Sequence, residues 1–117
     1  MMNTQENFRV QVRTEDRAVV FAVEGELDLA SSPTLEQELD RVRDEDVDLL
    51  IIDLRQLRFM DSTGLHALVK ANKRATEAGR RFALVRGGAQ IERLLSLTGV
   101  AELLIVADTP EELLRAG

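Results

Sequence analysis

The start of the chain shows two patterns typical of β-strands. Residues 8–13 alternate apolar and polar side chains without a break, as in a strand with one face toward water. Residues 18–23 form a nearly continuous apolar run before Gly25, which indicates a more buried strand. With a turn expected at residues 14–16, the two segments predict an antiparallel hairpin whose first strand lies nearer the edge of the sheet.

Helical and strand patterns alternate through the rest of the chain. Residues 49–54 are apolar throughout except Asp53, which favours a strand buried on both faces and parallel to its neighbour. Residues 82–85 and 103–106 predict two shorter strands. Residues at helical spacing predict the helices between them: Leu35, Leu39 and Val42; Leu65, Leu68, Val69 and Asn72; Ile91, Leu94 and Leu95.

The expected helix ends carry recognisable stop and start signals. Ser32-Pro33 predicts an N-cap followed by proline at the first helical position. Gly79 and Gly99 are expected to end the second and third helices. Residues 109–112, Thr-Pro-Glu-Glu, form a capping box that opens a closing helix.

The resulting order, β-β-α-β-α-β-α-β-α, predicts an α/β fold. Strands separated by helices imply right-handed crossovers, so we expect a mostly parallel sheet with an antiparallel N-terminal strand and about four helices. The chain has 117 residues and contains no linker or internal repeat. We therefore expect one domain spanning residues 1–117, with residues 1–7 as a flexible N-terminus.

The composition favours a protein partner over nucleic acid, metal or membrane. A net charge of −6 opposes binding to phosphates, and the absence of Trp and Tyr removes most stacking platforms for bases. No cysteine and a single histidine make a transition-metal site improbable, so neither a metal nor a cofactor is expected. The longest apolar run, residues 18–23, is far too short for a membrane span, and the N-terminus lacks signal-peptide features. We expect a cytoplasmic protein.

The sequence offers no convincing catalytic site. It has neither a Walker phosphate loop nor a Gly-x-Gly-x-x-Gly motif. Ser62, His66 and Asp61 could be combined into a triad, but residues four apart on one helix lie along its surface and do not surround a substrate. His66 is better interpreted as a solvent-facing helix residue. Gly87-Gly88 could form a small anion nest, and we favour a tight strand-to-helix turn instead.

Two segments have compositions that local structure does not require. Gly25-Glu26-Leu27-Asp28 stands at the end of the second predicted strand, and residues 59–65, Phe-Met-Asp-Ser-Thr-Gly-Leu, stand where a loop is expected to meet the second helix. In a parallel sheet the ends of the strands and the starts of the following helices gather along one edge, where partners usually bind. We therefore expect Asp28 and Ser62 to be exposed near the same edge.

These segments resemble the STAS domain family, specifically its anti-sigma factor antagonist branch. The resemblance covers nearly the whole chain, and residues 60–65 match the family's segment in which a regulatory phosphoserine follows an aspartate. On this chain the phosphoserine position is Ser62, and Asp28 matches an acidic residue of the same switch surface. The resemblance implies a switch surface comprising Asp28, Asp61, Ser62, Thr63 and Gly64.

The resemblance also implies a function without catalysis. Such a protein binds an anti-sigma factor, usually a serine kinase, while Ser62 is unphosphorylated, and thereby frees a sigma factor. The kinase then phosphorylates the antagonist and ends the interaction, and a phosphatase resets it. A bacterial, monomeric or weakly dimeric partner-switching protein is the expectation.

Other interpretations of the same residues remain open. Ser62 or Thr63 could serve only as an N-cap, which is worth roughly 1 kcal/mol. The protein would then be a non-switching STAS scaffold or adapter, as in stress-signalling or lipid-transport complexes. A nucleotide-binding or enzymatic role ranks last, because no phosphate loop or catalytic group supports it.

Overall fold

Six strands form one mixed sheet whose spatial order, β1-β2-β3-β4-β5-β6, is also the order of the chain. The computed structural model describes residues 2–5 and 7–116, with the side chains of residues 7–115. The strands are β1 Met2–Gln5, β2 Phe8–Glu15, β3 Ala18–Leu27, β4 Leu49–Met60, β5 Arg81–Val85 and β6 Ile105–Ala107. The helices are α1 Ser32–Arg41, α2 Ser62–Glu77, α3 Ala89–Leu97 and α4 Pro110–Ala116, with a 3-10 turn, η1, at Val100–Glu102.

The strand pairing confirms the predicted fold class. β1 pairs with β2 and β2 with β3 in antiparallel fashion, whereas the pairs β3–β4, β4–β5 and β5–β6 are parallel. The predicted hairpin is present, but its turn lies at Asp16 and Arg17 because β2 continues to Glu15. Asp16 adopts the left-handed conformation, with φ 53°, that a tight reversal of the chain requires.

The N-terminal residues include a strand that the sequence did not predict. Met2–Gln5 form β1 and pair with β2 from Met2↔Gln11 to Gln5↔Phe8. The expected flexibility of residues 1–7 stays a prediction. Residues 1 and 6 lie outside the described part of the chain. β1 is an edge strand that joins the sheet through backbone pairing with β2, and such pairing needs no apolar side-chain pattern.

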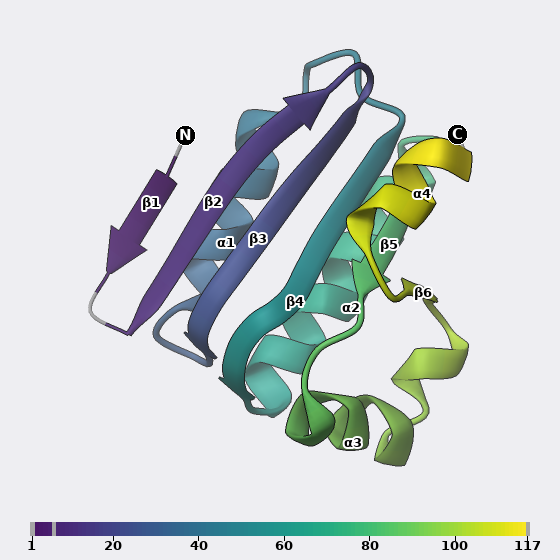
Figure 1. Ribbon diagram of the computed structural model, residues 1–117. Helices are drawn as coiled ribbons and strands as arrows, with labels where there is room; N and C mark the ends of the chain where they lie inside the picture. The colour runs from purple at the N-terminus through teal and green to yellow at the C-terminus, as the bar shows by residue number, and fades with distance from the viewer. Residues whose placement is uncertain (1, 6, 117) are drawn as a thin grey trace.

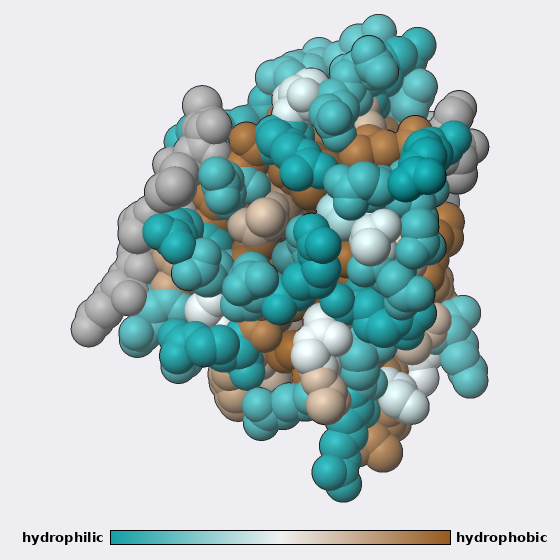
Figure 2. All heavy atoms as spheres, viewed as in Figure 1, coloured by the Kyte–Doolittle hydropathy of each residue, from teal (hydrophilic) through white to brown (hydrophobic). Residues whose placement is uncertain are grey.

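Helices cover the two faces of the sheet unequally. In Figure 1, α1 and α2 lie behind the sheet and α4 in front of it. The larger core cluster joins the rear face of β3 and β4 to α1, α2 and α3 through residues such as Phe21, Ile52, Leu35, Leu68 and Ile91. The smaller cluster joins the front face to Leu113 and Leu114 of α4. Hydrophilic side chains cover much of the front view in Figure 2.

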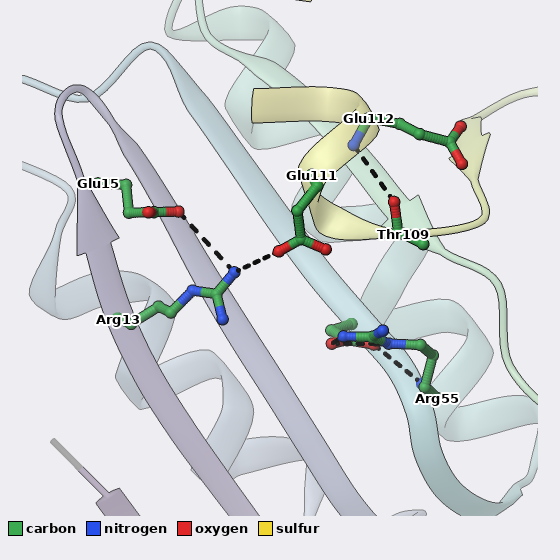
Figure 3. Close-up of polar contacts among 7 residues, drawn as sticks. Arg13, Glu15, Arg55, Thr109, Glu111 and Glu112 are labelled. Carbon is green, nitrogen blue, oxygen red and sulfur yellow. Dashed lines mark hydrogen bonds and ion pairs between the residues drawn. The ribbon is translucent and has the colours of Figure 1, made fainter. Parts of the chain in front are cut away.

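Ion pairs hold α4 over the front face. Arg13 of β2 lies 3.4 Å from Glu111 of α4 and 3.8 Å from Glu15, as Figure 3 shows. The Thr109 hydroxyl accepts a hydrogen bond from the Glu112 N–H at 3.3 Å, as the predicted capping box requires at this helix start. A neighbouring pair on β4 joins Arg55 to Asp53.

Strand β4 is twice as long as the six residues predicted. It continues past Leu54 to Met60 because bulges interrupt, without ending, its pairing with β3. Between the pairs Ala22↔Asp53 and Glu24↔Gln56 the strand gains one residue. The buried Asp53 carboxylate accepts from the Arg55 N–H at 3.1 Å and from its guanidinium at 2.8 Å. The hydrogen bond that the Arg55 guanidinium donates to Asp53 raises the pKa of Arg55.

Several predicted boundaries shift by a few residues. α1 begins at Ser32, which is therefore not its N-cap; that position belongs to Ser31. β6 begins at Ile105 instead of residue 103, because η1 and the Leu103 N–H bond to Val100 O (2.9 Å) occupy the preceding segment. Among the described helices, none combines the length and apolarity needed to cross a membrane.

The buried stripe of α2 differs in part from the predicted one. Leu65 and Leu68 are buried as expected, whereas Val69 and Asn72 are only half-buried. Small residues complete the stripe, and its buried members are Gly64, Leu65, Ala67, Leu68, Ala71 and Ala75. The helix ends as predicted at Gly79, whose N–H donates to Thr76 O while the Arg80 N–H donates to Ala75 O, the pattern of a Schellman motif.

Candidate functional site

The two segments singled out in the sequence meet at the carboxyl ends of β3 and β4. These strands are parallel neighbours, with Leu27 in register with Met60. Asp28 and Asp61 therefore leave adjacent strands at the same edge, and the Asp61 N–H donates to Leu27 O at 3.3 Å. Long-range pairing thus brings together residues more than 30 positions apart.

Asp61 caps helix α2. Its backbone is extended, and its Oδ1 accepts a hydrogen bond from the Gly64 N–H at 3.0 Å. Its carbonyl oxygen also accepts from the Leu65 N–H at 3.0 Å. The alternative in which Ser62 or Thr63 provides the N-cap is therefore wrong, because the preceding carboxylate already fills that position.

Ser62 is the first residue of α2 and is exposed. Thr63, one residue further into the turn, is half-buried. Because Asp61 caps the helix, the Ser62 hydroxyl is left out of the capping hydrogen bond and faces solvent. It is the more accessible hydroxyl of the two.

Gly64 allows α2 to begin in contact with the end of β3. A Cβ built on Gly64 would overlap the Leu27 carbonyl oxygen and lie 2.9 Å from both Leu27 Cγ and Met60 Cγ. Since heavy atoms cannot approach so closely, this position needs glycine for space and not for an unusual φ. Gly64 thereby fixes the distance between the start of α2 and the Asp28 turn.

Asp28 lies in the turn between β3 and α1 and is half-buried, whereas exposure was expected. Its Oδ1 accepts from the N–H groups of Ala30 (3.0 Å) and Ser31 (3.1 Å). Its own N–H donates to Ser31 Oγ at 2.8 Å, and that hydroxyl donates to Glu26 O at 2.7 Å. The carboxylate is thus held in place by the turn that it stabilises.

Two exposed apolar side chains flank this site, and the sequence analysis missed their importance. Leu29 is 74% exposed directly after Asp28, and Phe59 is 42% exposed on β4, in register with Glu26. The sequence signal that could have identified Leu29 is its position as a large apolar residue within a short turn next to Asp28. We call the following residues the strand-end surface: Asp28, Leu29, Phe59, Asp61, Ser62, Thr63 and Gly64.

The chemical alternatives find little support in the geometry. His66 is exposed, as predicted, and among the described residues no hydrogen bond joins it to Ser62 or Asp61. No cluster of three or more potential metal-binding side chains occurs in the described part of the chain. The Gly87 N–H donates to the Glu92 carboxylate at 3.2 Å, so this N–H is already used within the chain and does not favour an anion nest at Gly87-Gly88.

The STAS domain family model matches residues 9–113. The chain belongs to the STAS domain family. The matched residues include the whole strand-end surface, from Asp28 to Gly64. An anti-sigma-B factor antagonist from Staphylococcus aureus (strain NCTC 8325 / PS 47) is 29% identical over 105 residues, which are 90% of this chain and 97% of the relative.

Solved structures give the same family relationship. An anti-sigma factor antagonist from Mycobacterium paratuberculosis superimposes with a TM-score of 0.83 and 28% identity, covering 93% of this chain and 92% of the other. The Bacillus cell fate determinant SpoIIAA in its phosphorylated form gives a TM-score of 0.72 at 21% identity, over 92% and 97% of the two chains. At 21% identity, the likeness to SpoIIAA shows a shared fold.

Proposed function

We propose that this STAS protein is an anti-sigma factor antagonist whose strand-end surface binds an anti-sigma factor with serine kinase activity and releases it when Ser62 is phosphorylated. The observation that carries the proposal is the division of labour at the start of α2. Asp61 caps the helix at 3.0 Å from the Gly64 N–H, and the adjacent Ser62 is exposed. A serine without a capping duty can be modified without unravelling the helix.

The strand-end surface combines features of a regulated interface. Leu29 and Phe59 supply apolar area that a partner can bury, and the turn that contains Leu29 holds the half-buried Asp28 carboxylate in place. Interfaces gain affinity from such exposed anchors when the polar groups around them are already positioned. The unmodified surface therefore suits a protein partner.

Phosphorylation changes the charge at this surface. Transfer of the γ-phosphoryl group of ATP to Ser62 Oγ releases ADP and the hydroxyl proton, and adds about −1.5 to −2 charges. The new group lies next to the Asp61 carboxylate and at the same sheet edge as Asp28. A partner packed there must desolvate these charges together, and a penalty of about 3 kcal/mol lowers affinity about a hundredfold. A phosphatase that removes the phosphate restores binding.

The proposal is tested with the full chain, a cognate anti-sigma kinase and ATP. Mass spectrometry should find one phosphate, on Ser62, in the wild type and in the matched control Thr63→Ala, and none on Ser62→Ala. Calorimetry should show that Ser62→Ala binds the kinase like the unmodified wild type, because no cap is lost. Ser62→Asp should bind more weakly, though by less than the phosphorylated protein, since it adds a single charge.

The same measurement separates a switch from a permanent scaffold. A scaffold would bind the wild type, Ser62→Ala and Ser62→Asp with equal affinity, and this result would refute the proposal. Phosphate transfer to Thr63 in preference to Ser62 would refute the assignment of the site.

A further inference from the structure

His66 lies on the same exposed face of α2 as Ser62. The two residues are separated by four positions within the helix Ser62–Glu77, and both are exposed. Side chains four residues apart on a helix are neighbours, with Cβ atoms about 5–6 Å apart. Because helical side chains generally lean toward the N-terminus, the imidazole of His66 can reach the turn that begins with Ser62.

The charges around Ser62 differ on its two sides. On the loop side stand the acidic residues Glu26 and Asp28 from β3 and its turn, and Asp61 from the end of β4, with the exposed Arg58 on β4. Along the exposed face of α2 the following charged residues are His66, Lys70 and Lys73. From the neighbouring helix α1, Glu36 faces this side but pairs with Lys70 at 3.7 Å.

His66 is the group on this face best placed to respond to a phosphate. Among the described residues it has neither a hydrogen-bond nor an ion-pair partner, whereas Lys70 is paired with Glu36 and the Asp28 and Asp61 carboxylates accept from backbone N–H groups. Lys73 stands 11 residues beyond Ser62, about 16 Å along the helix axis, too far for direct contact.

We propose that His66 is the intramolecular counter-charge of phosphorylated Ser62, drawing the phosphate over the first turn of α2. This inference rests on the proposed phosphorylation of Ser62. The second ionisation of a phosphoserine lies near pH 6. A cationic side chain four residues further along the helix favours the dianionic phosphate, so the pairing lowers the pH at which the phosphate loses its second proton.

The pairing reduces the added charge that a partner meets at the proposed switch. Part of the negative charge of the phosphate is neutralised within the same molecule by the imidazole. The acidic residues on the loop side, Glu26, Asp28 and Asp61, would by contrast repel the phosphate toward the helix.

The test uses the full chain with phosphoserine genetically encoded at position 62, so that no kinase is needed. The 31P resonance is followed from pH 4.5 to 8.5 in the His66 protein and in the variants His66→Gln and His66→Lys. The midpoint of the phosphate's second ionisation should be highest with His66→Gln and lowest with His66→Lys, because a permanent cation always favours the dianion. The His66 protein should lie between them, about 0.15–0.4 pH units below His66→Gln.

A relocated histidine provides the matched control. The double variant His66→Gln/Lys73→His keeps a single imidazole on α2 but moves it three turns from the phosphate, and its midpoint should equal that of His66→Gln. Because the wild type has one histidine, its imidazole proton resonances can also be followed without assignment ambiguity. Phosphorylation should shift their titration to higher pH with His66 in place and not in the relocated control.

The outcomes separate this inference from the proposed function. Equal 31P midpoints for the His66 protein, His66→Gln and His66→Lys would overturn the pairing and leave partner switching intact. Ordered midpoints together with a kinase that never modifies Ser62 would support the pairing and refute the proposed function.

Discussion

The assignment of the α2 cap to Asp61 can be tested through stability. Asp61→Ala removes the oxygen that accepts from the Gly64 N–H at 3.0 Å and leaves that donor without its partner. Loss of an N-cap costs about 1 kcal/mol, and loss of a negative charge at a helix N-terminus costs about a further 0.3–1 kcal/mol. We therefore expect Asp61→Ala to lower the free energy of unfolding by about 1–2 kcal/mol.

Two further variants separate the contributions of the cap and of the charge to the loss of stability expected for Asp61→Ala. Asp61→Asn keeps an acceptor oxygen and removes only the charge, so it should lose about 0.3–1 kcal/mol, reduced by any relief of repulsion with Asp28. Ser62→Ala removes a hydroxyl that does not cap the helix, and its stability should lie within about 0.5 kcal/mol of the wild type.

Urea unfolding followed by far-UV circular dichroism suits this comparison, because the chain contains neither Trp nor Tyr for fluorescence. With a denaturant slope of about 1–3 kcal/mol/M, Asp61→Ala should move the midpoint by about 0.3–2 M. A loss for Ser62→Ala as large as that for Asp61→Ala would show that Ser62 contributes to capping, and would remove the main support for a freely modifiable serine.

Two further predictions concern backbone positions near the site. Gly64→Ala should lower the free energy of unfolding by about 1–3 kcal/mol, because its Cβ would overlap Leu27. The control Gly88→Ala meets no atom within 4 Å and should lose at most about 1 kcal/mol, because Gly88 is the N-cap of α3 and alanine is a poorer cap than glycine. Asp53→Ala should cost about 1–3 kcal/mol in the same assay by leaving the Arg55 N–H in the bulge without its acceptor, while Asp53→Asn, which keeps an acceptor oxygen, should cost less. A neutral Gly64→Ala, or equal losses for the two Asp53 variants, would contradict these explanations.

The sequence predicted the order of elements because each helix and most strands carry a regular apolar pattern. The parallel pairing of β3 with β4 followed from that order, and it predicted that Asp28 and Ser62 would share one edge. β1 was missed because Met2–Gln5 is mostly polar and pairs through its backbone. Such an edge strand has no side-chain periodicity to detect.

The predicted end of β4 at Leu54 was wrong for a different reason. Bulges in β4 shift the alternation of inward and outward side chains, so the segment after Leu54 loses the period of two that identifies a strand. The capping residue was misassigned because the aspartate, serine and threonine at positions 61–63 are all good N-caps, and only the tertiary position of Gly64 against Leu27 selects the first of them.

The identity between strand order and chain order also bears on how the protein assembles during synthesis. No strand has to insert between two that are already paired, so the sheet can grow from β1 toward β6 as the chain leaves the ribosome. The strand-end surface uses only residues from Asp28 to Gly64, and the helix that follows ends at Glu77. The strand-end surface can therefore form before β5, β6 and α4 have joined the sheet, provided that β3 and β4 pair first.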